Sequence, residues 1–501
     1  MQPGNDPKLH TNEEAVNPIT EGVIWKQLLL YFVPLLAASF LQLLYNTADT
    51  IIVGRFVGKI ALTAVGGSAG QIYAMVTEFM VGVSGGAGVI LSQAYGARDR
   101  KLLDDGLHNA IALALVIGTL FTCVGLILAG PALRLAGAPP ETLANSILYL
   151  RIVSAGLISN VLYNMGASIL RAVGDSKKPL HFLLISSCMN ILLDILFVAV
   201  LHWGIGGAAF ATILSQTLSA TLVLRTLIRG PGTVEESAVL VNGTEKADHT
   251  LEGATLQDAS DSLREALMPS LDLHRLRLQR DIVSKMLRLG VPLGFETLMY
   301  TFSCVVLTSA VNTFGTDTVA AYAGFVRIES FYWMLEAAFA VSITTFVGQN
   351  YGAGRMDRVH KVARQGAVLM YLFMGTAIVI MYTGCPVWLG LFTTDAGVLA
   401  IGVAMMRYLL PYYILYVPSG VFFSTLRGLG DSLRPTIITF LCVCVLRIAW
   451  VAFVFPAYPT IEALLFCFPV SWTVTAVTYP FYYAWYIKNH RVTLRFPPQR
   501  W

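Results

Sequence analysis

The sequence predicts an all-α polytopic membrane protein with 12 transmembrane helices, arranged as two six-helix bundles that repeat each other. Three observations predict this fold. Of the 501 residues, 55% are hydrophobic and only 13% are charged, long apolar runs recur along the chain, and both halves carry the same motifs. Soluble globular proteins carry about 25% charged residues. The composition therefore excludes a soluble enzyme, a disordered chain and a secreted disulfide-rich scaffold.

Each predicted helix is an apolar run of about 20 residues or more, which is enough to cross the hydrocarbon core of a membrane. The runs cover residues 24–53, 60–95, 107–130, 143–171, 179–201, 205–228, 285–313, 317–350, 362–384, 396–426, 435–456 and 462–487. The first bundle is expected at 24–228 and the second at 285–487, with tails at 1–23 and 488–501. A polar linker at 229–284 separates the two bundles.

Basic residues orient these helices. Of the 34 Lys and Arg residues, 27 lie in the tails, the linker and the connections after even-numbered helices, and only three lie in the odd-numbered connections. Positive charge marks the cytoplasmic side of membrane proteins. We therefore expect both termini and the linker in the cytoplasm of a bacterial inner-membrane protein. In the linker, leucines alternate with basic residues over 263–289, which fits an amphipathic helix at the membrane surface or a plain charged segment.

The two halves match at a nearly constant offset. SQAYGA at 92–97 matches GQNYGA at 348–353, and LRAVGDS at 170–176 matches LRGLGDS at 426–432, both 256 residues apart. Six helices per half give a parallel repeat, the architecture of alternating-access carriers with a substrate site between two bundles. A channel more often surrounds one pore with identical subunits, so a carrier is favoured.

The LRAVGDS and LRGLGDS motifs each end a helix with glycine, and a new helix begins after the turn. We expect Gly174 and Gly430 to end helices. The arginines Arg171 and Arg427 are expected to clasp the aspartates that close each motif. Those aspartates are Asp175 and Asp431.

With LYNTADT at 44–50, the LRAVGDS segment with Pro179, and GQNYGAG at 348–354, the chain resembles the multidrug and toxic compound extrusion (MATE) family. The resemblance covers all but about forty residues of the linker. It implies export of cationic or amphipathic organic compounds against an inward flow of H⁺ or Na⁺, by a protein that is not an enzyme. We expect a monomer whose partners are small organic cations or drugs and membrane lipids, with no nucleic acid and no cofactor besides the ion.

Acids within the spans are candidates for function, because an ionised group at the membrane centre costs about 2.5–3.5 kcal/mol. Asn190 and Asp194 are one helical turn apart on the fifth span, and Asp49 lies on the first. Together they offer oxygen ligands for Na⁺ or a proton-accepting carboxylate pair, although Asn190 alone also suits a packing hydrogen bond. The resemblance implies a cation site at these three residues, extended by Thr212 and Ala208.

The second half lacks these groups, since Leu307, Leu446 and Trp450 stand at the matching positions. Ion coupling is therefore expected in the first bundle. Glu296 resembles a glutamate of the NorM-type branch, but 396–426 contains no acid to accompany it. Glu296 is instead expected to contact a cationic substrate or to pair with a membrane arginine.

Glu78 and Glu336 occupy matching positions and are expected to face a shared cavity. Tyr332 and Trp333 precede Glu336, and aromatic faces beside a carboxylate suit a bulky organic cation. The alternative is aromatic packing, with either glutamate paired to Arg327 or Arg407. The two glutamates, Tyr332 and Trp333 are therefore substrate-binding candidates, together with Glu296.

Two other functions compete with drug export. A lipid-linked oligosaccharide flippase of the wider superfamily would favour a cavity rich in Arg and Lys. In this sequence, the acids expected within the membrane are at least as numerous as the basic residues there. A receptor or scaffold would use the linker for signalling, yet nothing in it resembles a docking or catalytic domain. The chain has no Walker motif, so ATP is not expected to drive transport directly.

Overall fold

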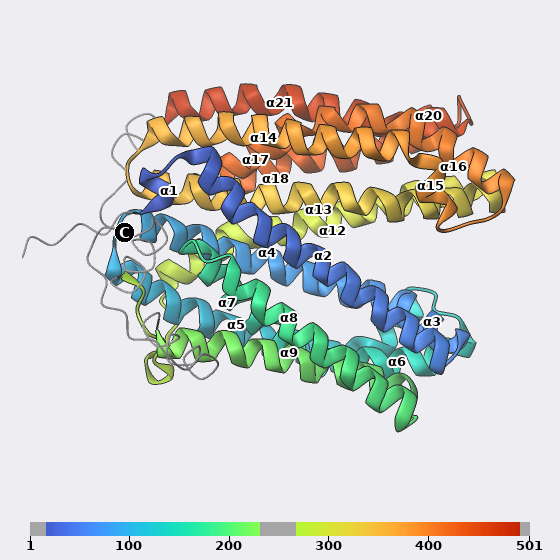
Figure 1. The fold of residues 1–501 in the computed structure, drawn as a ribbon, viewed down its shortest axis with the longest axis horizontal. Helices are drawn as coiled ribbons and strands as arrows, with labels where there is room; N and C mark the ends of the chain where they lie inside the picture. Colours follow the sequence, from blue (N-terminus) through green and yellow to red (C-terminus); the bar gives the residue numbers. More distant parts are fainter. Residues whose placement is uncertain (1–16, 231–266, 491–501) are drawn as a thin grey trace, which may run out of the picture.

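The computed structural model describes residues 17–230 and 267–490 (Figure 1). These residues form helices and turns and contain no strand, which confirms the all-α fold class. Predictions for residues 1–16, 231–266 and 491–501 fall outside the described residues.

The first half begins with a short helix and continues with long ones (Figure 1, blue to green). Its elements are α1 (Pro18–Glu21), α2 (Ile24–Phe56), α3 (Lys59–Gly66), α4 (Ser68–Gly96), α5 (Arg100–Leu135), α6 (Pro140–Ala155), α7 (Leu157–Ala172), α8 (Lys177–Asp194), η1 (Ile195–Val200) and α9 (Gly204–Arg229).

The second half follows the linker (Figure 1, yellow to red). Its elements are η3 (Leu273–Arg275), α12 (Arg280–Val311), η4 (Asn312–Phe314), α13 (Thr316–Gly352), α14 (Met356–Thr383), α15 (Cys385–Gly390), α16 (Ala396–Leu409), η5 (Leu410–Tyr416), α17 (Val417–Gly428), α18 (Leu433–Thr439), η6 (Phe440–Val445), α19 (Leu446–Ala449), η7 (Trp450–Val454), α20 (Ile461–Leu465) and α21 (Cys467–Asn489).

The described residues contain 11 helices long and apolar enough to cross a membrane, and a twelfth span if the bent pair α6–α7 is one span. This pair bends by 47° at Gly156, where a side chain would collide with Ile213 of α9. The described tails and linker ends lie at one end of the molecule, called here the terminal end (Figure 1). The opposite, distal end carries α3, α15 and α20.

Helix α2 crosses from one half to the other, and Figure 1 shows it running diagonally between them. Near the terminal end, Leu28 and Phe32 are buried in the hydrophobic core of the second half, where the Phe32 ring stacks on Phe339 at 4.0 Å. Toward the distal end, Ile52 and Val53 belong to a core of the first half. Helix α2 is therefore packed into both bundles.

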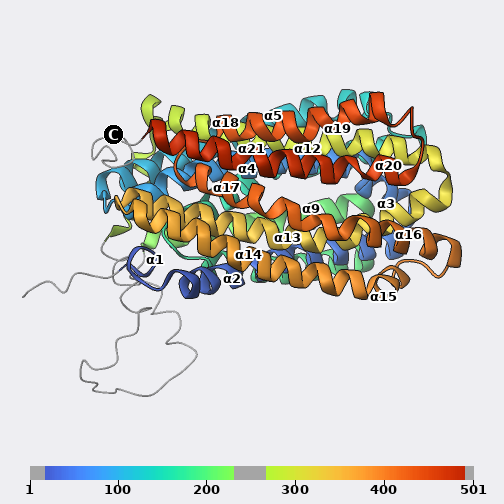
Figure 2. The same cartoon turned by 90° about the horizontal axis from the view of Figure 1, so that it is seen from above.

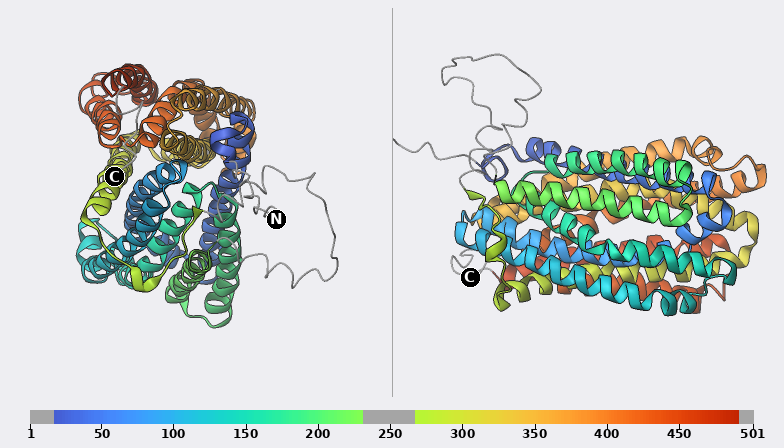
Figure 3. Two further views of the ribbon diagram at one scale, coloured as in Figure 1. Left: turned by 90° about the vertical axis from the view of Figure 1, so that its left-hand side faces the viewer. Right: turned by 90° about the horizontal axis from the view of Figure 1, so that it is seen from below.

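Helix α12, the counterpart of α2 in the repeat, crosses in the opposite sense. Its terminal-end residues Met286 and Leu289 are buried in a core of the first half, whereas Leu307 and Val311 lie in the core of the second half. The two halves thus exchange the terminal-end portions of their first long helices. Figure 3 (left) views this end, with the two halves one above the other.

Glycines allow α4 and α12 to touch through their backbones. A Cβ on Gly82 would lie 2.6 Å from the Cα of Gly294, and one on Gly86 would lie 2.6 Å from the Cα of Gly290. Real Cβ atoms do not approach other atoms so closely, so any larger residue would push the helices apart. Small residues are the usual means by which membrane helices pack closely without a hydrophobic driving force.

Nearer the terminal end, the repeated glutamines join the halves reciprocally. Gln93 Nε2 donates to the carbonyl of Gly428 at 2.8 Å, and Gln349 Nε2 donates to the carbonyl of Ala172 at 2.8 Å. Donors and acceptors are both 256 residues apart, so the two bonds are equivalent under the repeat. We call this pair of hydrogen bonds the glutamine latch.

The short helix α1 adds further contacts between the halves at the terminal end. Asn17 Nδ2 donates to Gln349 Oε1 at 3.2 Å, and Arg355 donates to the carbonyl of Thr20 at 2.7 Å. Glu21 forms an ion pair with Arg98 of the first half at 3.5 Å. Helix α1 therefore contacts both halves at the terminal end.

The linker does not form the amphipathic helix considered above, at least in its described part. Residues 268–279 contain only the turn η3, and α-helix begins at Arg280. Two basic side chains instead bind the start of α5, where Arg275 pairs with Asp104 at 2.7 Å and Arg277 pairs with Asp105. Because these ion pairs fix the segment to α5, its leucines do not line up on one helical face.

The glutamine latch predicts that Gln93→Ala combined with Gln349→Ala opens the terminal end more often. Each lost hydrogen bond is worth about 1 kcal/mol, or roughly a fivefold change in population. A Ser92→Cys reporter, whose parent serine is 1% exposed, should then react several-fold faster with an impermeant maleimide in inverted membrane vesicles.

Gln71→Ala is the matched control, because Gln71 is an exposed glutamine on the same helix α4. Equal labelling rates in the control and the latch variant would contradict the role assigned to the two glutamines.

Candidate cation and substrate sites

The three residues of the cation site predicted in the first bundle lie together in the structure. Asp49 projects from α2, and its carboxyl group is adjacent to that of Asp194 on α8. Asn190 lies one turn before Asp194, and both are fully buried. Asp194 is the last residue of α8, after which the chain continues as the π-helix η1. Such wide turns frequently occur at functional sites.

These side chains hold polar atoms that no donor or acceptor satisfies among the described residues. The atoms are Asp49 Oδ1, both carboxyl oxygens of Asp194, and the amide oxygen and nitrogen of Asn190. Buried polar groups normally have hydrogen-bond partners, so each exception needs an explanation. Two adjacent carboxyl groups also repel when both are ionised. A proton shared between them or a small cation would remove both problems.

Thr212 and Ala208 border this cluster from α9. The Thr212 hydroxyl donates to the carbonyl of Ala208 at 3.0 Å, and both residues are buried. The Thr212 side chain also lies beside the hydroxyl of Tyr45, one turn before Asp49 on α2. Ala208 contributes only its carbonyl, and this carbonyl already accepts the threonine hydroxyl.

Sequence reasoning missed several polar neighbours of this cluster. Tyr45 follows the helical spacing of Asp49, and Gln216 follows that of Thr212, so both could have been found by that signal. The hydroxyl of Tyr73 and the side chain of Gln216 form a hydrogen bond at 3.0 Å. Tyr149 is buried close to the same acids. These hydroxyl and amide groups surround the acid pair on the side of α4, α6 and α9.

The donor set suits H⁺ or a hard monovalent cation such as Na⁺. It contains carboxylate, amide and hydroxyl oxygens, which hard cations prefer. The described residues contain no group of three or more His, Cys, Asp or Glu side chains able to hold a metal ion. The oxygen-rich site therefore fits both H⁺ and Na⁺.

In the second half, Glu296 and Glu336 lie within electrostatic reach of one arginine, Arg427. The Arg427 side chain also contacts Gly85 of α4, across the boundary between the halves. Arg427 is the arginine of the repeated motif, and we expected it to contact Asp431 and not these two glutamates.

Two expectations about arginines are therefore wrong. Arg427 does not clasp Asp431, which instead accepts a hydrogen bond from Tyr482. Glu336 does not pair with Arg327 or Arg407, because both arginines are exposed. The motif glycines do end their helices as expected, with φ of +90° at Gly174 and +92° at Gly430.

In the first copy of the motif, Asp175 binds the start of the next helix. Its carboxylate accepts from the backbone N–H groups of Lys177 and Lys178 at 3.2 and 3.0 Å, which satisfies the start of α8. It also forms an ion pair with the Lys178 side chain at 3.5 Å. Arg171 lies near its repeat mate Arg427.

Glu78 and its repeat mate Glu336 have different surroundings. The Glu78 side chain is exposed on α4, next to Phe79, whose ring contacts Phe295 of α12 at 5.7 Å. Glu336 is partly buried near Gly420 and Arg427. A cavity shared by the two glutamates stays a prediction.

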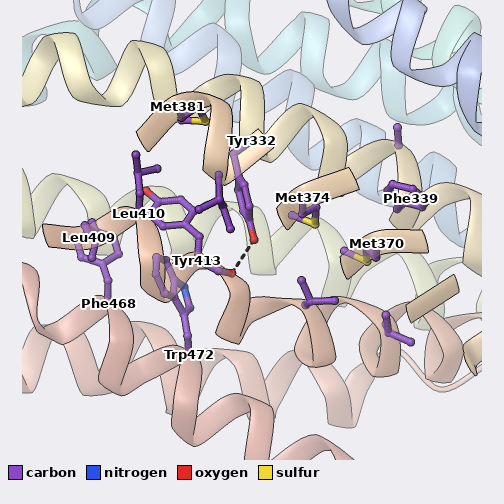
Figure 4. Packing of buried hydrophobic residues seen from close by; sticks show 14 of the residues in the cluster. Tyr332, Phe339, Met370, Met374, Met381, Leu409, Leu410, Tyr413, Phe468 and Trp472 are labelled. Atoms are coloured by element: carbon purple, nitrogen blue, oxygen red, sulfur yellow. Dashed lines mark hydrogen bonds between the residues drawn. The ribbon is translucent and has the colours of Figure 1, made fainter. Parts of the chain in front are cut away.

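The aromatic candidates split into one buried and one partly exposed residue. Tyr332 has no exposed surface, and its hydroxyl donates to the carbonyl of Tyr413 at 2.7 Å (Figure 4). Tyr332 is therefore part of the protein core in this conformation, and its contact with a substrate stays a prediction. Trp333 is partly exposed and contacts Tyr416 with ring centroids 5.0 Å apart.

Glu329 and Arg447 hold this aromatic cluster in place, and sequence reasoning assigned neither of them a role there. Glu329 accepts from Trp333 Nε1 at 2.6 Å and from the Tyr413 hydroxyl at 2.8 Å. Arg447 is fully buried, with its guanidinium 4.3 Å from the ring centroid of Phe468. Figure 4 shows Phe468, Tyr413 and Trp472 side by side in this core. Figure 2, turned by 90°, shows α13 beside α17 and α14, the helices that surround it.

A family model named MatE matches the chain twice, over residues 34–196 and 292–453. The chain belongs to the MATE family of transporters. The two matched segments begin 258 residues apart, in agreement with the internal repeat, and leave the linker between them. The match covers the acid pair in the first half and Glu296, Glu336 and Arg427 in the second.

Named relatives agree with this membership. The chain is 28% identical over 445 residues to "Probable multidrug resistance protein YoeA" of Bacillus subtilis, covering 88% of this chain and 89% of that protein. It is 26% identical to "Probable multidrug resistance protein NorM" of Thermotoga maritima, covering 87% and 86%. A solved structure described as an outward-facing MATE transporter of the MOP superfamily has a TM-score of 0.81 at 21% identity, covering 97% of this chain and all of the other.

The two hydrogen bonds to Glu329 predict a structural role for this carboxylate. Glu329→Gln keeps the shape of the side chain but leaves one of two buried donors unsatisfied, which costs about 1–3 kcal/mol. We expect the Tm of the purified protein to fall by roughly 2–6 °C, measured by intrinsic fluorescence in detergent.

Glu141→Gln is the control, because Glu141 is exposed in the first turn of α6 and should leave the Tm unchanged. An unchanged Tm in Glu329→Gln would refute the structural role.

Proposed function

We propose that this MATE protein is a secondary active multidrug exporter that exchanges cationic or amphipathic organic compounds for H⁺ or Na⁺. The observation that carries the proposal is the adjacent pair Asp49–Asp194 with Asn190, in which five buried polar atoms find no hydrogen-bond partner among the described residues. Two relatives named as probable multidrug resistance proteins support the substrate class.

The coupling ion is proposed to act on the packing of α2 against α8. With both carboxylates ionised, Asp49 and Asp194 repel each other in a medium of low dielectric constant. A proton or Na⁺ between them removes the repulsion and draws the two helices together. Helix α2 continues into the core of the second half through Leu28 and Phe32, so a change at Asp49 is transmitted to the contact between the halves.

The terminal end is proposed to be cytoplasmic, because it carries the basic tails, loops and linker. The glutamine latch and the α4–α12 contact then close the cytoplasmic side, and the structure corresponds to an outward-facing state. For exchange, ion and substrate must prefer different states of the contact between the halves. Ion binding in this state and release after the terminal end opens would satisfy that requirement.

The substrate is proposed to bind near Glu296, Glu336 and Trp333. The two carboxylates attract an organic cation, and the partly exposed indole offers an aromatic face. Arg427 already lies near both acids, so an organic cation has to compete with this internal cation. Compounds with a charge and an extended aromatic surface should therefore bind better than small cations.

A flippase for a lipid-linked oligosaccharide is less well supported. A polyanionic headgroup would be repelled by Glu296 and Glu336, and the arginines Arg151, Arg327 and Arg407 lie on the exposed surface. Arg447 is buried under the aromatic cluster and is not available to a headgroup in this conformation.

The first prediction of this proposal concerns the acid pair. Asp49→Asn and Asp194→Asn should each reduce gradient-driven efflux of ethidium from proteoliposomes by at least tenfold, because neither amide can take up the coupling charge. Efflux is measured under a proton gradient alone and under a sodium gradient alone, which also identifies the ion.

Asp395→Asn serves as the control. Asp395 is exposed at the N-cap of α16, where asparagine caps equally well, so transport should be unchanged. Normal efflux in both acid variants would refute the coupling site while leaving the carrier function standing.

The second prediction concerns the substrate acids. Glu336→Gln should raise the KM for ethidium about tenfold, since it removes one of two carboxylates that attract the cation. The KM for a neutral amphipathic substrate should change less than twofold. Equal changes for charged and neutral substrates would show that Glu336 supports the fold and does not bind the cation.

A further inference from the structure

A cleft of about 1470 Å³ opens at the terminal end beside the glutamine latch, and the proposed ion and substrate sites lie outside it. Residues from both halves line it. Lys101 and Asp105 come from α5 in the first half, Arg280 and Arg288 from the start of α12, and Arg434 from α18 in the second half. A lipid headgroup or another phosphate-bearing molecule is smaller than this volume.

Cations from both halves converge on the cleft. Lys101, Arg280 and Arg288 line it, and none of the three forms an ion pair with any residue that the structure describes. Arg434 is exposed and lies over the ring of Trp485, 5.6 Å from its centroid, and its side chain also contacts that of Tyr482. The cations therefore come from three helices and both halves.

The acids of the cleft are mostly engaged elsewhere. Asp99 accepts from the backbone N–H of Leu102 at 2.9 Å and caps α5. Asp105 is paired with Arg277, and Asp431 accepts from Tyr482. Asp281 is the remaining lining acid, and it is exposed in the first turn of α12. The cleft therefore presents more uncommitted positive than negative charge.

The edge of the cleft has the character of a membrane interface. Leu433 lines it and is 46% exposed, as is Ile437 one turn further along α18. Trp485 and Tyr482 stack on each other nearby, with ring centroids 5.6 Å apart. Trp and Tyr gather where membrane and water meet, so this edge is placed at the level of lipid headgroups.

We propose that the cleft binds the phosphate headgroup of an anionic membrane lipid, whose acyl chains lie over Leu433 and Ile437. Basic pockets between transmembrane helices are a recurring type of headgroup site. A soluble phosphate compound would use the same cations but has no use for the exposed aliphatic edge. This site is independent of the proposed drug export, since it shares no residue with the acid pair or with Glu296 and Glu336.

The position of the cleft gives the lipid a function. Lys101 belongs to the first half and Arg434 to the second, so one headgroup contacts both halves beside the glutamine latch. Gln93 of the latch itself lines the cleft. A headgroup bound to both sides stabilises the closed terminal end and is released when the halves separate there. Anionic lipid therefore favours the conformation described in this structure.

The test is native mass spectrometry of the full-length protein in detergent, with phosphatidylglycerol or phosphatidylcholine added at equal concentrations. We expect at least tenfold more bound phosphatidylglycerol than phosphatidylcholine in the wild type. The triple variant Lys101→Gln, Arg288→Gln, Arg434→Gln should lose this preference, since each basic residue near a membrane surface contributes appreciably to binding of anionic lipid.

A charge-matched control is Lys177→Gln, Lys361→Gln, Arg364→Gln, which removes three exposed cations at the same end but outside the cleft. It should keep the wild-type preference. The variant Arg288→Lys, Arg434→Lys should also keep most of it, which separates loss of charge from loss of fold. The Tm of each variant without lipid checks folding.

Two results would overturn the proposal. Equal retention of the two lipids in the wild type, or equal loss in the triple variant and its control, would show that the cleft does not select an anionic headgroup. Inorganic phosphate that displaces phosphatidylglycerol at millimolar concentration would show a site for a soluble anion. In contrast, an increase of Tm with phosphatidylglycerol in the wild type and none in the triple variant would support the lipid site.

Discussion

The close approach of α4 and α12 is the constraint on which the rest of this structure depends. Gly82 and Gly86 meet Gly294 and Gly290 through their backbones, so the two halves touch without intervening side chains. In a membrane, where helices gain little from hydrophobic burial, such contact supplies van der Waals attraction. It also aligns the terminal end, where Gln93 reaches the opposite half.

The two halves use the same backbone plan for different chemistry. The first half places Asp49 and Asp194 side by side with no cation from the described residues acting on them, whereas the acids of the second half lie near Arg427. Two carboxylates without a counter-charge are stabilised by a bound proton or ion, whereas Arg427 already stabilises the carboxylates of the second half. This difference supports the proposal that the first repeat couples to an ion and the second binds an organic cation.

Most of the fold could be predicted because the signals involved are local. Apolar length defined the spans, and matching motifs defined the repeat, which the family model confirms by matching twice. The acid pair was also accessible, since Asn190 and Asp194 follow helical spacing on one face. The contacts of Arg427 could not be predicted because its partners lie far away in the chain, and nothing in local spacing indicates which half a long side chain enters.

The sequence by itself determined the membrane class, the parallel repeat and the placement of Asp49, Asn190 and Asp194 in the first bundle, because composition, periodicity and motif spacing can be read along the chain. Only the tertiary structure decided that α2 and α12 exchange their terminal-end portions, that Arg427 faces Glu296 and Glu336, and that cations from α5, α12 and α18 share one cleft. These features depend on how helices pack across the repeat. That packing follows from shape and close backbone contact, which no single segment encodes.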